Sequence, residues 1–568
     1  MFTLLLQLTN IATVASPAPL FPTIVTDVPG RLASDHFVAE IARLRPAGQP
    51  ATTFEPLYVF QSTAKIANEK SAPTNGYFSH LNNWTVSWVS SQIEVAEGLL
   101  LRVKRANGGA PIKAAAVHPR SAGVHVLSVG TEWVTLSTSS LSTRVAVDFD
   151  GAMDETDTGP SYKGPPLHTF CWFVDAAMGA SDLPDPTASD VIIVRPGDDL
   201  AKVNASKLSA TVWQTVVFAP GVHRAATPGK AKRTVLWQAP LTRYFFCAGS
   251  VVHAAFAAGA NAGSKWGAKG FVMDGFGILT GEDMIRPAGD NTSPQGITWD
   301  GVVNSSLLGV TVVDFPNHHL ILGGGSDDFN EIHGVKVLGW RANGDGLHVF
   351  KNWHVSDLFM RTQDDSMYLD SGGATATTFD RVTTWNDANG CAFIYSAGGG
   401  DTSTNILRDS TAIYARASWA WWSGGRIFGL RHTSTGKVMS GVTVDRLVVE
   451  DRLPSLNAWE FDATCNGGAG SCKNAGFVNL SFTNVHIANW STVRSHGQTL
   501  LPKGVPNIML TDHLDAVKNN VSVNRIRFTN CSIGGVDLAA TFKDGHSWNI
   551  SKGRSVHDIT VDGKPVEV

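Results

Sequence analysis

Charged side chains are scarce in this chain. Only 17% of its 568 residues are Asp, Glu, Lys or Arg, below the roughly 25% usual for soluble domains. The net charge of −4 excludes the basic surface with which nucleic-acid-binding proteins neutralise phosphates. We therefore predict no nucleic-acid partner, and a neutral ligand suits the composition better than a polyanion.

The sequence also lacks the common signatures of metal and cofactor sites. It contains no zinc-ligand pattern, no phosphate-binding glycine loop and no dinucleotide fingerprint. The central histidines, among them His318 and His348, do not have the spacing of a metal motif, and we interpret them as hydrogen-bonded polar positions. We predict no cofactor and no metal. No stretch approaches the ~18 to 20 apolar residues of a membrane-spanning helix, so no membrane partner is predicted either.

Cysteine is rare as well, with six in the chain. Cys465 and Cys472 flank the loop Asn-Gly-Gly-Ala-Gly-Ser, which is flexible enough to close a small ring, and we predict a disulfide between them. The sequence does not determine how the remaining four pair, namely Cys171, Cys247, Cys391 and Cys531.

Two features favour a secreted, extracellular glycoprotein. Residues 1–16 hold two short apolar runs followed by small residues, and we interpret them as a signal peptide, although a basic start is missing. A disordered or strand-forming terminus is the alternative. Sequons for N-glycosylation occur at Asn83, Asn204, Asn291, Asn304, Asn479, Asn489, Asn520, Asn530 and Asn549.

What the chain has in abundance is short strands separated by turns. The 56 glycines and many Ser, Thr and Asn residues indicate numerous turns and an all-β protein. Residues 17–189 contain alternating runs such as Val124–Val129, which predict a β-sandwich. In residues 190–568, runs such as Gly309–Asp314 and His333–Leu338 recur about every twenty to twenty-five residues without intervening helices. This period predicts a right-handed parallel β-helix, with a propeller or a second sandwich as the alternative.

One aspartate precedes a pair of adjacent aspartates by about one such period. Asp345 lies in Asn-Gly-Asp-Gly, and Asp364 and Asp365 follow in Gln-Asp-Asp-Ser. Stacked strands lie about 4.8 Å apart, so residues one coil apart can meet at one place on the surface. Neighbouring residues of a strand point to opposite faces, so the Asp pair must sit at a bend or bulge. An Asp pair alone is weak evidence, because Asp198-Asp199 occurs in a turn-like context.

These motifs resemble those of the family-49 glycoside hydrolases, the dextranase and isopullulanase group, and more distantly the polygalacturonase-like enzymes. Besides the three aspartates, the resemblance rests on Phe218–Val222, Gly275–Glu282, and Trp385 with Asn389, and it covers roughly residues 191–449. It implies an N-terminal β-sandwich, a β-helix, and cleavage of a neutral α-glucan by an inverting mechanism. It also implies that Asp364 is the general acid and that Asp345 and Asp365 orient the attacking water. Tyr368 stands where the family is expected to have Lys, so substrate contacts are expected to differ.

Further groove residues are predicted from residue type. Flat indole rings stack on sugars, which makes Trp353 and Trp385 candidates for substrate contact, with core packing as the alternative. Asn389 and Tyr368 complete the predicted substrate-binding set, and Glu282 either lines the groove or solvates a turn.

Taken together, the sequence predicts a secreted, monomeric, endo-acting glycosidase with a polysaccharide or oligosaccharide substrate. One alternative is a uronide hydrolase or polysaccharide lyase on the same fold. It is disfavoured because no Gly-His-Gly and no Arg-x-Lys clamp follows the Asp pair. The other alternative is a carbohydrate-binding β-helix without activity, in which the carboxylates merely solvate turns.

Overall fold

The structure is a computed structural model of the full chain. It describes residues 20–44, 53–64, 84–93, 98–154, 166–207, 215–225, 236–238, 243–259, 269–284, 295–324, 329–339, 341, 343–370, 377–387, 390–396, 405–416, 426–431, 436–452, 457–462, 474, 476–489, 508–511, 522–541, 548–550 and 556–566. The predicted signal peptide, Asn389 and the predicted Cys465 to Cys472 disulfide lie outside these residues.

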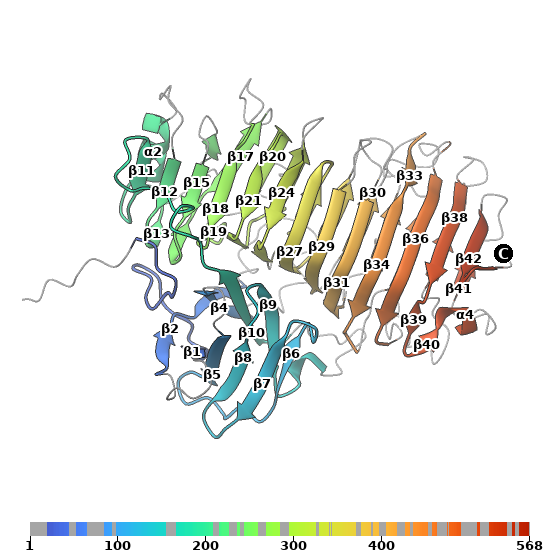
Figure 1. Ribbon diagram of the computed structural model, residues 1–568, viewed down its shortest axis with the longest axis horizontal. Helices are drawn as coiled ribbons and strands as arrows, with labels where there is room; N and C mark the ends of the chain where they lie inside the picture. Colours follow the sequence, from blue (N-terminus) through green and yellow to red (C-terminus); the bar gives the residue numbers. More distant parts are fainter. Residues whose placement is uncertain are drawn as a thin grey trace, which may run out of the picture.

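The chain folds into a β-sandwich beneath a long β-helix (Figure 1). One sheet of the sandwich contains, in spatial order, β2 (Glu55–Leu57), β1 (Phe37–Leu44), β5 (Gly98–Arg105), β8 (Val134–Thr138) and β7 (Val124–Val129). The other contains β3 (Phe60–Thr63), β4 (Thr85–Ile93), β10 (His168–Ala176), β9 (Thr143–Phe149) and β6 (Ala115–His118). A short 3-10 helix, η3 (Ala152–Asp154), follows β9.

The β-helix begins at β11, and the predicted division between residues 189 and 190 lies between β10 and this strand. Its strands form two long ladders of parallel pairs, antiparallel only at the C-terminal end. The larger ladder runs in chain order through β11 (Val191–Val194), β12 (Thr215–Phe218), β13 (Gly221–His223), β15 (Arg243–Phe246), β16 (Ser250–Val252), β18 (Val272–Gly275), β19 (Ile278–Thr280), β21 (Ser306–Leu308), β22 (Thr311–Val313), β24 (Asn330–His333), β25 (Lys336–Leu338), β27 (Trp353–Thr362), β29 (Thr377–Asn386), β31 (Asn405–Ala415), β33 (Val438–Ser440), β34 (Val442–Val449), β36 (Gly476–Ile487), β38 (Ser522–Thr529), β39 (Ser532–Ile533), β40 (Val536–Asp537), β42 (Val556–Val561) and β43 (Lys564–Pro565).

The smaller ladder contains β14 (Leu236–Gln238), β17 (Ala255–Gly259), β20 (Ile297–Val302), β23 (Leu320–Gly324), β26 (Leu347–Val349), β28 (Met367–Asp370), β30 (Cys391–Ser396), β32 (Arg426–Arg431), β35 (Asn457–Asp462), β37 (Ile508–Thr511) and β41 (Trp548–Ile550). The described helices are α2 (Leu200–Lys207) and α4 (Leu538–Thr541). Within the described ranges, no helix is long and apolar enough to cross a membrane. The predicted fold class, all-β with a parallel β-helix, is confirmed.

One corner of each coil is made by a single residue in the left-handed region. The strand register places these residues directly above one another through nine successive coils. They are Gly275, Gly309, Gly334, Asp357, Arg381, Asp409, Arg446, Asn484 and Asn530, with φ between 50° and 110°. Glycine, Asn and Asp adopt this region most readily. The charged members are paired along the ladder, as in the bonds from Arg381 to Asp357 and from Arg446 to Asp409.

The sheet that contains β4 and β10 is buried on both faces. Phe170, Trp172 and Val174 point into the sandwich, whereas the alternating Cys171 and Phe173 pack against the β-helix. This double burial explains why the apolar run in β10 is continuous rather than alternating. Across the contact, the ring centroid of Phe173 lies 5.2 Å from that of Phe359 in β27. The two domains therefore share an apolar interface.

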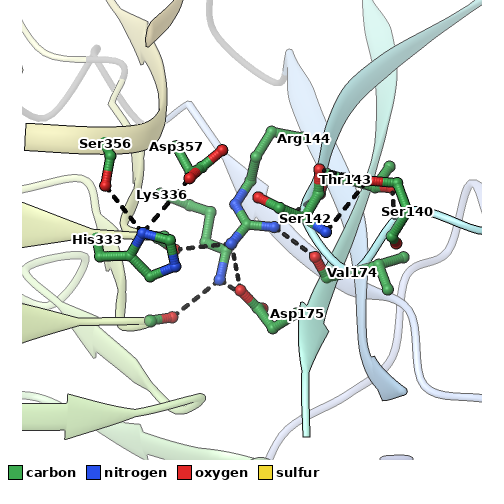
Figure 2. A network of polar contacts seen from close by, with 12 residues as sticks. Ser140, Ser142, Thr143, Arg144, Val174, Asp175, His333, Lys336, Ser356 and Asp357 are labelled. Carbon is green, nitrogen blue, oxygen red and sulfur yellow. Dashed lines mark hydrogen bonds and ion pairs between the residues drawn. The ribbon is translucent and has the colours of Figure 1, made fainter. Parts of the chain in front are cut away.

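A buried ionic network crosses the same interface (Figure 2). Lys336 in β25 is fully buried and donates hydrogen bonds to Asp175 Oδ2 at 2.7 Å and to the Gly309 carbonyl oxygen at 2.9 Å. Arg144 of the sandwich pairs with the other oxygen of Asp175 and donates to the Gly334 carbonyl oxygen at 3.3 Å. One carboxylate thus compensates two buried cations.

The Lys336 ammonium makes the stability of this interface depend on pH. Burial, followed by the charge of Arg144, lowers the pKa of Lys336 from 10.5 to about 7. The unfolded chain therefore binds more protons than the folded chain between about pH 7 and 10.5, so stability rises with pH across this window, by at most about 1.4 kcal/mol per pH unit. We expect chemical denaturation from about pH 6 to about pH 9 to show this rise in the wild type and its loss in Lys336→Met. Parallel pH profiles for the two proteins would contradict the assignment.

The four cysteines whose pairing the sequence left open are buried free thiols. Burial raises the pKa of Cys171 to about 12 and that of Cys531 to about 11, and it also raises the pKa of Cys247. Because the thiolate is the reactive form, these three thiols are protected against oxidation.

Candidate active site

The Asp364-Asp365 pair lies in the bend between β27 and β28, not within a strand. The Thr362 hydroxyl donates a hydrogen bond to the Asp364 carbonyl oxygen at 2.8 Å and lies 2.7 Å from the Ser366 hydroxyl. Asn386, one coil further on, donates its side-chain amide to the same carbonyl oxygen at 2.8 Å. The bend therefore avoids the strand alternation that would send one carboxylate into the apolar core.

Backbone amides orient both carboxylates of the pair. The Asp365 N–H donates to Asp364 Oδ1 at 2.9 Å, and the Asn343 N–H, one coil earlier, donates to Asp364 Oδ2 at 3.3 Å. The Cys391 N–H, one coil later, donates to Asp365 Oδ1 at 2.6 Å. Each carboxylate is thus positioned by a neighbouring coil, and Asp364 also by its own.

The third carboxylate, Asp345, occupies the matching place one coil before Asp365. Leu347 pairs with Met367, and the Gly346 N–H donates to the Asp365 carbonyl oxygen at 2.9 Å, so the register continues back to the two aspartates. Adjacent parallel strands lie about 4.8 Å apart. All three aspartates are mostly buried, with exposed fractions of 6 to 7%. The structure thus brings together the three residues that the sequence motifs singled out.

Two histidines flank Asp345. His348 Nε2 lies 2.7 Å from Asp345 Oδ2, and His318 Nδ1 lies 3.2 Å from Oδ1. Burial by itself raises the pKa of Asp345, but the charges and hydrogen bonds of His318 and His348 outweigh it and hold that pKa well below its ordinary value. Asp345 is therefore ionised across the physiological range.

The predicted substrate residue Tyr368 stacks on His348. The ring centroids lie 4.5 Å apart with an interplanar angle of 4°, and the two residues face each other on the outer side of β26 and β28. Both side chains are partly exposed. Tyr368 thus orients a histidine of the site and is itself partly exposed to solvent.

A third histidine lies behind the site and fixes its backbone. The N–H and Nδ1 of His319 both lie 2.9 Å from the Asp345 carbonyl oxygen. Burial lowers the pKa of His319 to about 4, so the ring is neutral at pH 7 and donates from Nδ1. A Cβ on Gly339 would lie 2.3 Å from the His319 ring, which explains the glycine there.

Gly390 packs directly on two of the carboxylates. It has a φ of 74°, and a Cβ there would lie 2.3 Å from Asp365 Oδ1 and 2.7 Å from Asp364 Oδ1. We expect Gly390→Ala to displace both side chains and to lower kcat by about 10²-fold, because catalytic groups tolerate little misplacement. Kinetics of purified variants would measure this.

The matched control for that substitution is Gly436→Ala. Gly436 has nearly the same φ, 73°, but no atom lies within 4 Å of the place a Cβ would take. It should show only the backbone cost of about 1 kcal/mol in stability, without loss of kcat. Equal losses of activity in the two variants would mean that backbone strain, not the contact with the carboxylates, is responsible.

The prediction that Trp353 and Trp385 line a substrate groove is wrong. Trp353 is fully buried inside the β-helix, with its ring centroid 6.0 Å from that of Trp299. Trp385 is fully buried at the domain interface, where its Nε1 donates to Asp387 Oδ1 at 2.5 Å and the Arg361 guanidinium lies over its ring. Neither indole can reach a sugar, because both faces are covered by protein.

Glu282 has a structural role instead of a place in the groove. Its Oε2 accepts hydrogen bonds from Arg31 Nη1 at 3.1 Å and from the Thr280 hydroxyl at 3.2 Å. Burial raises its pKa, but the charge of Arg31 and further hydrogen bonds bring the pKa below the ordinary value. Glu282 therefore binds the sandwich to the β-helix as an anion.

The site residues that sequence reasoning missed are His318 and His348. The sequence alone suggests that both are hydrogen-bonded polar residues without a catalytic role, because their spacing of thirty residues matches no metal or catalytic motif. The available signal was their distance from Asp345: His348 follows it by three residues, and His318 precedes it by about one coil.

Comparison with known proteins supports the fold. No family model matches this chain, and no curated protein matches it in sequence. The solved structure of Dex49A from Penicillium minioluteum superposes with a TM-score of 0.68 and 16% sequence identity, over 95% of this chain and 96% of that one. The two proteins share a fold. It is the fold that the resemblance to the family-49 glycoside hydrolases implied.

Two further solved structures are similar over much of their length but superpose more loosely. A family 28 exopolygalacturonase from Yersinia enterocolitica has a TM-score of 0.40 and 12% identity over 95% of this chain and 99% of that one. The catalytic domain of a GH87 alpha-1,3-glucanase in complex with nigerose has a TM-score of 0.36 and 11% identity, covering 95% of this chain and 89% of that one.

Proposed function

We propose that this protein is a secreted glycoside hydrolase that cleaves α-glucosidic bonds within a neutral, dextran-like or pullulan-like polysaccharide, with inversion at the anomeric carbon. The main support for this proposal is that Asp345, Asp364 and Asp365 lie together on adjacent coils. Glycosidic hydrolysis needs one carboxylic acid to protonate the leaving oxygen and one carboxylate to activate water or sugar. Asp364 and Asp365, held by backbone amides, and Asp345, held by two imidazoles, meet this requirement.

The environment of each carboxylate supports a division of roles. Asp345 lies against two imidazoles that keep it ionised, so it is suited to orient the attacking water as a carboxylate and not to donate a proton. The acid is then one of the bend residues, and the family resemblance selects Asp364. Asp365, fixed by the Cys391 N–H, joins Asp345 in orienting the water.

The surroundings of the site support a neutral substrate. A uronide needs a free cation to bind its carboxylate. The nearby Arg341 instead pairs with Asp314 at 3.2 Å and donates to the Met284 carbonyl oxygen, and Arg361 pairs with Asp387 at 3.1 Å. Both guanidinium groups are buried in these contacts.

The test is incubation of the purified protein with dextran, pullulan, starch and polygalacturonate. Reducing ends report cleavage, product size reports endo or exo attack, and proton NMR of the first products reports the anomer. We expect cleavage of a neutral α-glucan into oligosaccharides with the β-anomer formed first. Cleavage of polygalacturonate alone would overturn the substrate class, and α-anomeric first products would overturn inversion.

A further inference from the structure

The imidazoles and the carboxylate around Asp345 form a ready set of metal ligands. His318 Nδ1, an Asp345 carboxylate oxygen and His348 Nε2 all lie within 4.8 Å of one another. Ligand atoms of a tetrahedral zinc ion, each about 2.0 to 2.1 Å from the metal, are separated by about 3.3 Å. The two imidazoles lie against the two oxygens of this carboxylate, His318 Nδ1 at 3.2 Å from Oδ1 and His348 Nε2 at 2.7 Å from Oδ2. An ion between the rings would therefore meet both oxygens, and the shorter contact would open by roughly half an ångström.

The three side chains are also held in place before any ion arrives. His348 lies against Tyr368 on one side, and its ring centroid is 4.4 Å from that of His318 on the other. The backbone of Asp345 is held by the two bonds from His319. Ligands that are fixed in advance lose little conformational freedom on binding, which favours affinity.

The site is open enough to admit an ion and its water. The side chains of His318 and His348 are 25% and 14% exposed, whereas that of Asp345 is 8% exposed. An ion would therefore rest on the carboxylate from the solvent side. Two neutral imidazoles and one carboxylate leave a divalent ion with one net positive charge and an open position for water, as in three-ligand zinc sites.

We propose that His318, Asp345 and His348 bind one divalent transition-metal ion, and that this ion reversibly blocks hydrolysis. The block rests on the proposed function, because Asp345 orients the attacking water there. An ion that takes both the carboxylate and the space before it displaces the attacking water from the group that orients it. Binding of the ion itself does not depend on that function.

The binding test uses the full chain without a histidine tag, with Zn²⁺ in isothermal titration calorimetry and Co²⁺ in absorption spectroscopy. We expect one Zn²⁺ per chain, and visible absorption bands of low-coordinate Co²⁺. His348→Gln and His318→Gln should each weaken Zn²⁺ binding at least about tenfold. The matched control is His354→Gln, because His354 is a 47% exposed histidine that bonds to Thr378 on another face.

The activity test adds Zn²⁺ during hydrolysis of the polysaccharide that the protein cleaves. Inhibition should follow the measured Zn²⁺ binding curve and reverse with a chelator. Equal Zn²⁺ affinity in the wild type and in His348→Gln would overturn the metal site, and full activity at saturating Zn²⁺ would overturn the block. Zn²⁺ binding by a protein that cleaves no polysaccharide would overturn the proposed hydrolase but support the metal site.

Discussion

Asp364→Asn is expected to lower kcat by roughly 10²- to 10⁴-fold, the usual contribution of a general acid, while substrate binding persists. The substitution conserves shape. The Asp365 N–H donates to Oδ1 of Asp364 and the Asn343 N–H to Oδ2, so the single oxygen of Asn can keep one of these two bonds. The substitution removes the other bond and the proton that the leaving oxygen needs. Initial rates on the cleaved glucan, together with affinity electrophoresis in the same glucan, would separate the two effects.

The matched control is Asp198→Asn, in the other Asp-Asp pair whose structure is described. Asp198 is exposed and its side chain accepts a bond from the Arg195 N–H at 2.8 Å in a turn. It should leave kcat unchanged. If Asp364→Asn still hydrolyses the glucan at a near wild-type rate, Asp364 is not the general acid. Loss of binding together with activity would instead indicate a substrate contact.

Asp175→Ala is expected to destabilise the protein by about 3 to 5 kcal/mol, the cost of leaving buried charge without its partner. It deprives both Lys336 and Arg144 of the one carboxylate between them. The measurement is chemical denaturation at about pH 6, below the Lys336 pKa of about 7, followed by tryptophan fluorescence. By contrast, Asp35→Ala removes a carboxylate that is 67% exposed and lies 3.2 Å from His36 Nε2, and it should cost at most about 1 kcal/mol.

Removing the charge of Lys336 should partly restore the stability of Asp175→Ala. In Asp175→Ala, replacing Lys336 by Met removes one of the two stranded cations, so the double variant should be more stable than the single one. A double variant less stable than Asp175→Ala would show that Lys336 contributes through packing rather than through its charge.

The architecture was predictable because it repeats. A period of twenty to twenty-five residues with short β-branched runs is visible along the chain, and the same period placed Asp345 one coil before the Asp pair. The bend at Asp364 was predictable too, since strand alternation forbids two outward neighbours. Both predictions depend only on local geometry.

The wrong predictions concern which side of a coil is covered. Trp385 does lie on the outer side of β29, but the sandwich packs there, and nothing in the sequence of that coil records this. Trp353 lies on the inner side of β27. The histidines beside Asp345 were missed for a related reason: His318 reaches it from another coil, through a strand register that only the structure supplies.

The left-handed corner residues limit how this chain can change in length. Each coil from Gly275 to Asn530 brings one residue with positive φ into the same vertical line. An insertion or deletion of a few residues within a strand would move that residue off the line, and an odd number of residues would also turn the following side chains to the opposite face. Evolution and protein engineering can therefore lengthen or shorten this body most easily by duplicating or removing entire coils, and the spacing between the three aspartates is conserved under such changes elsewhere in the helix.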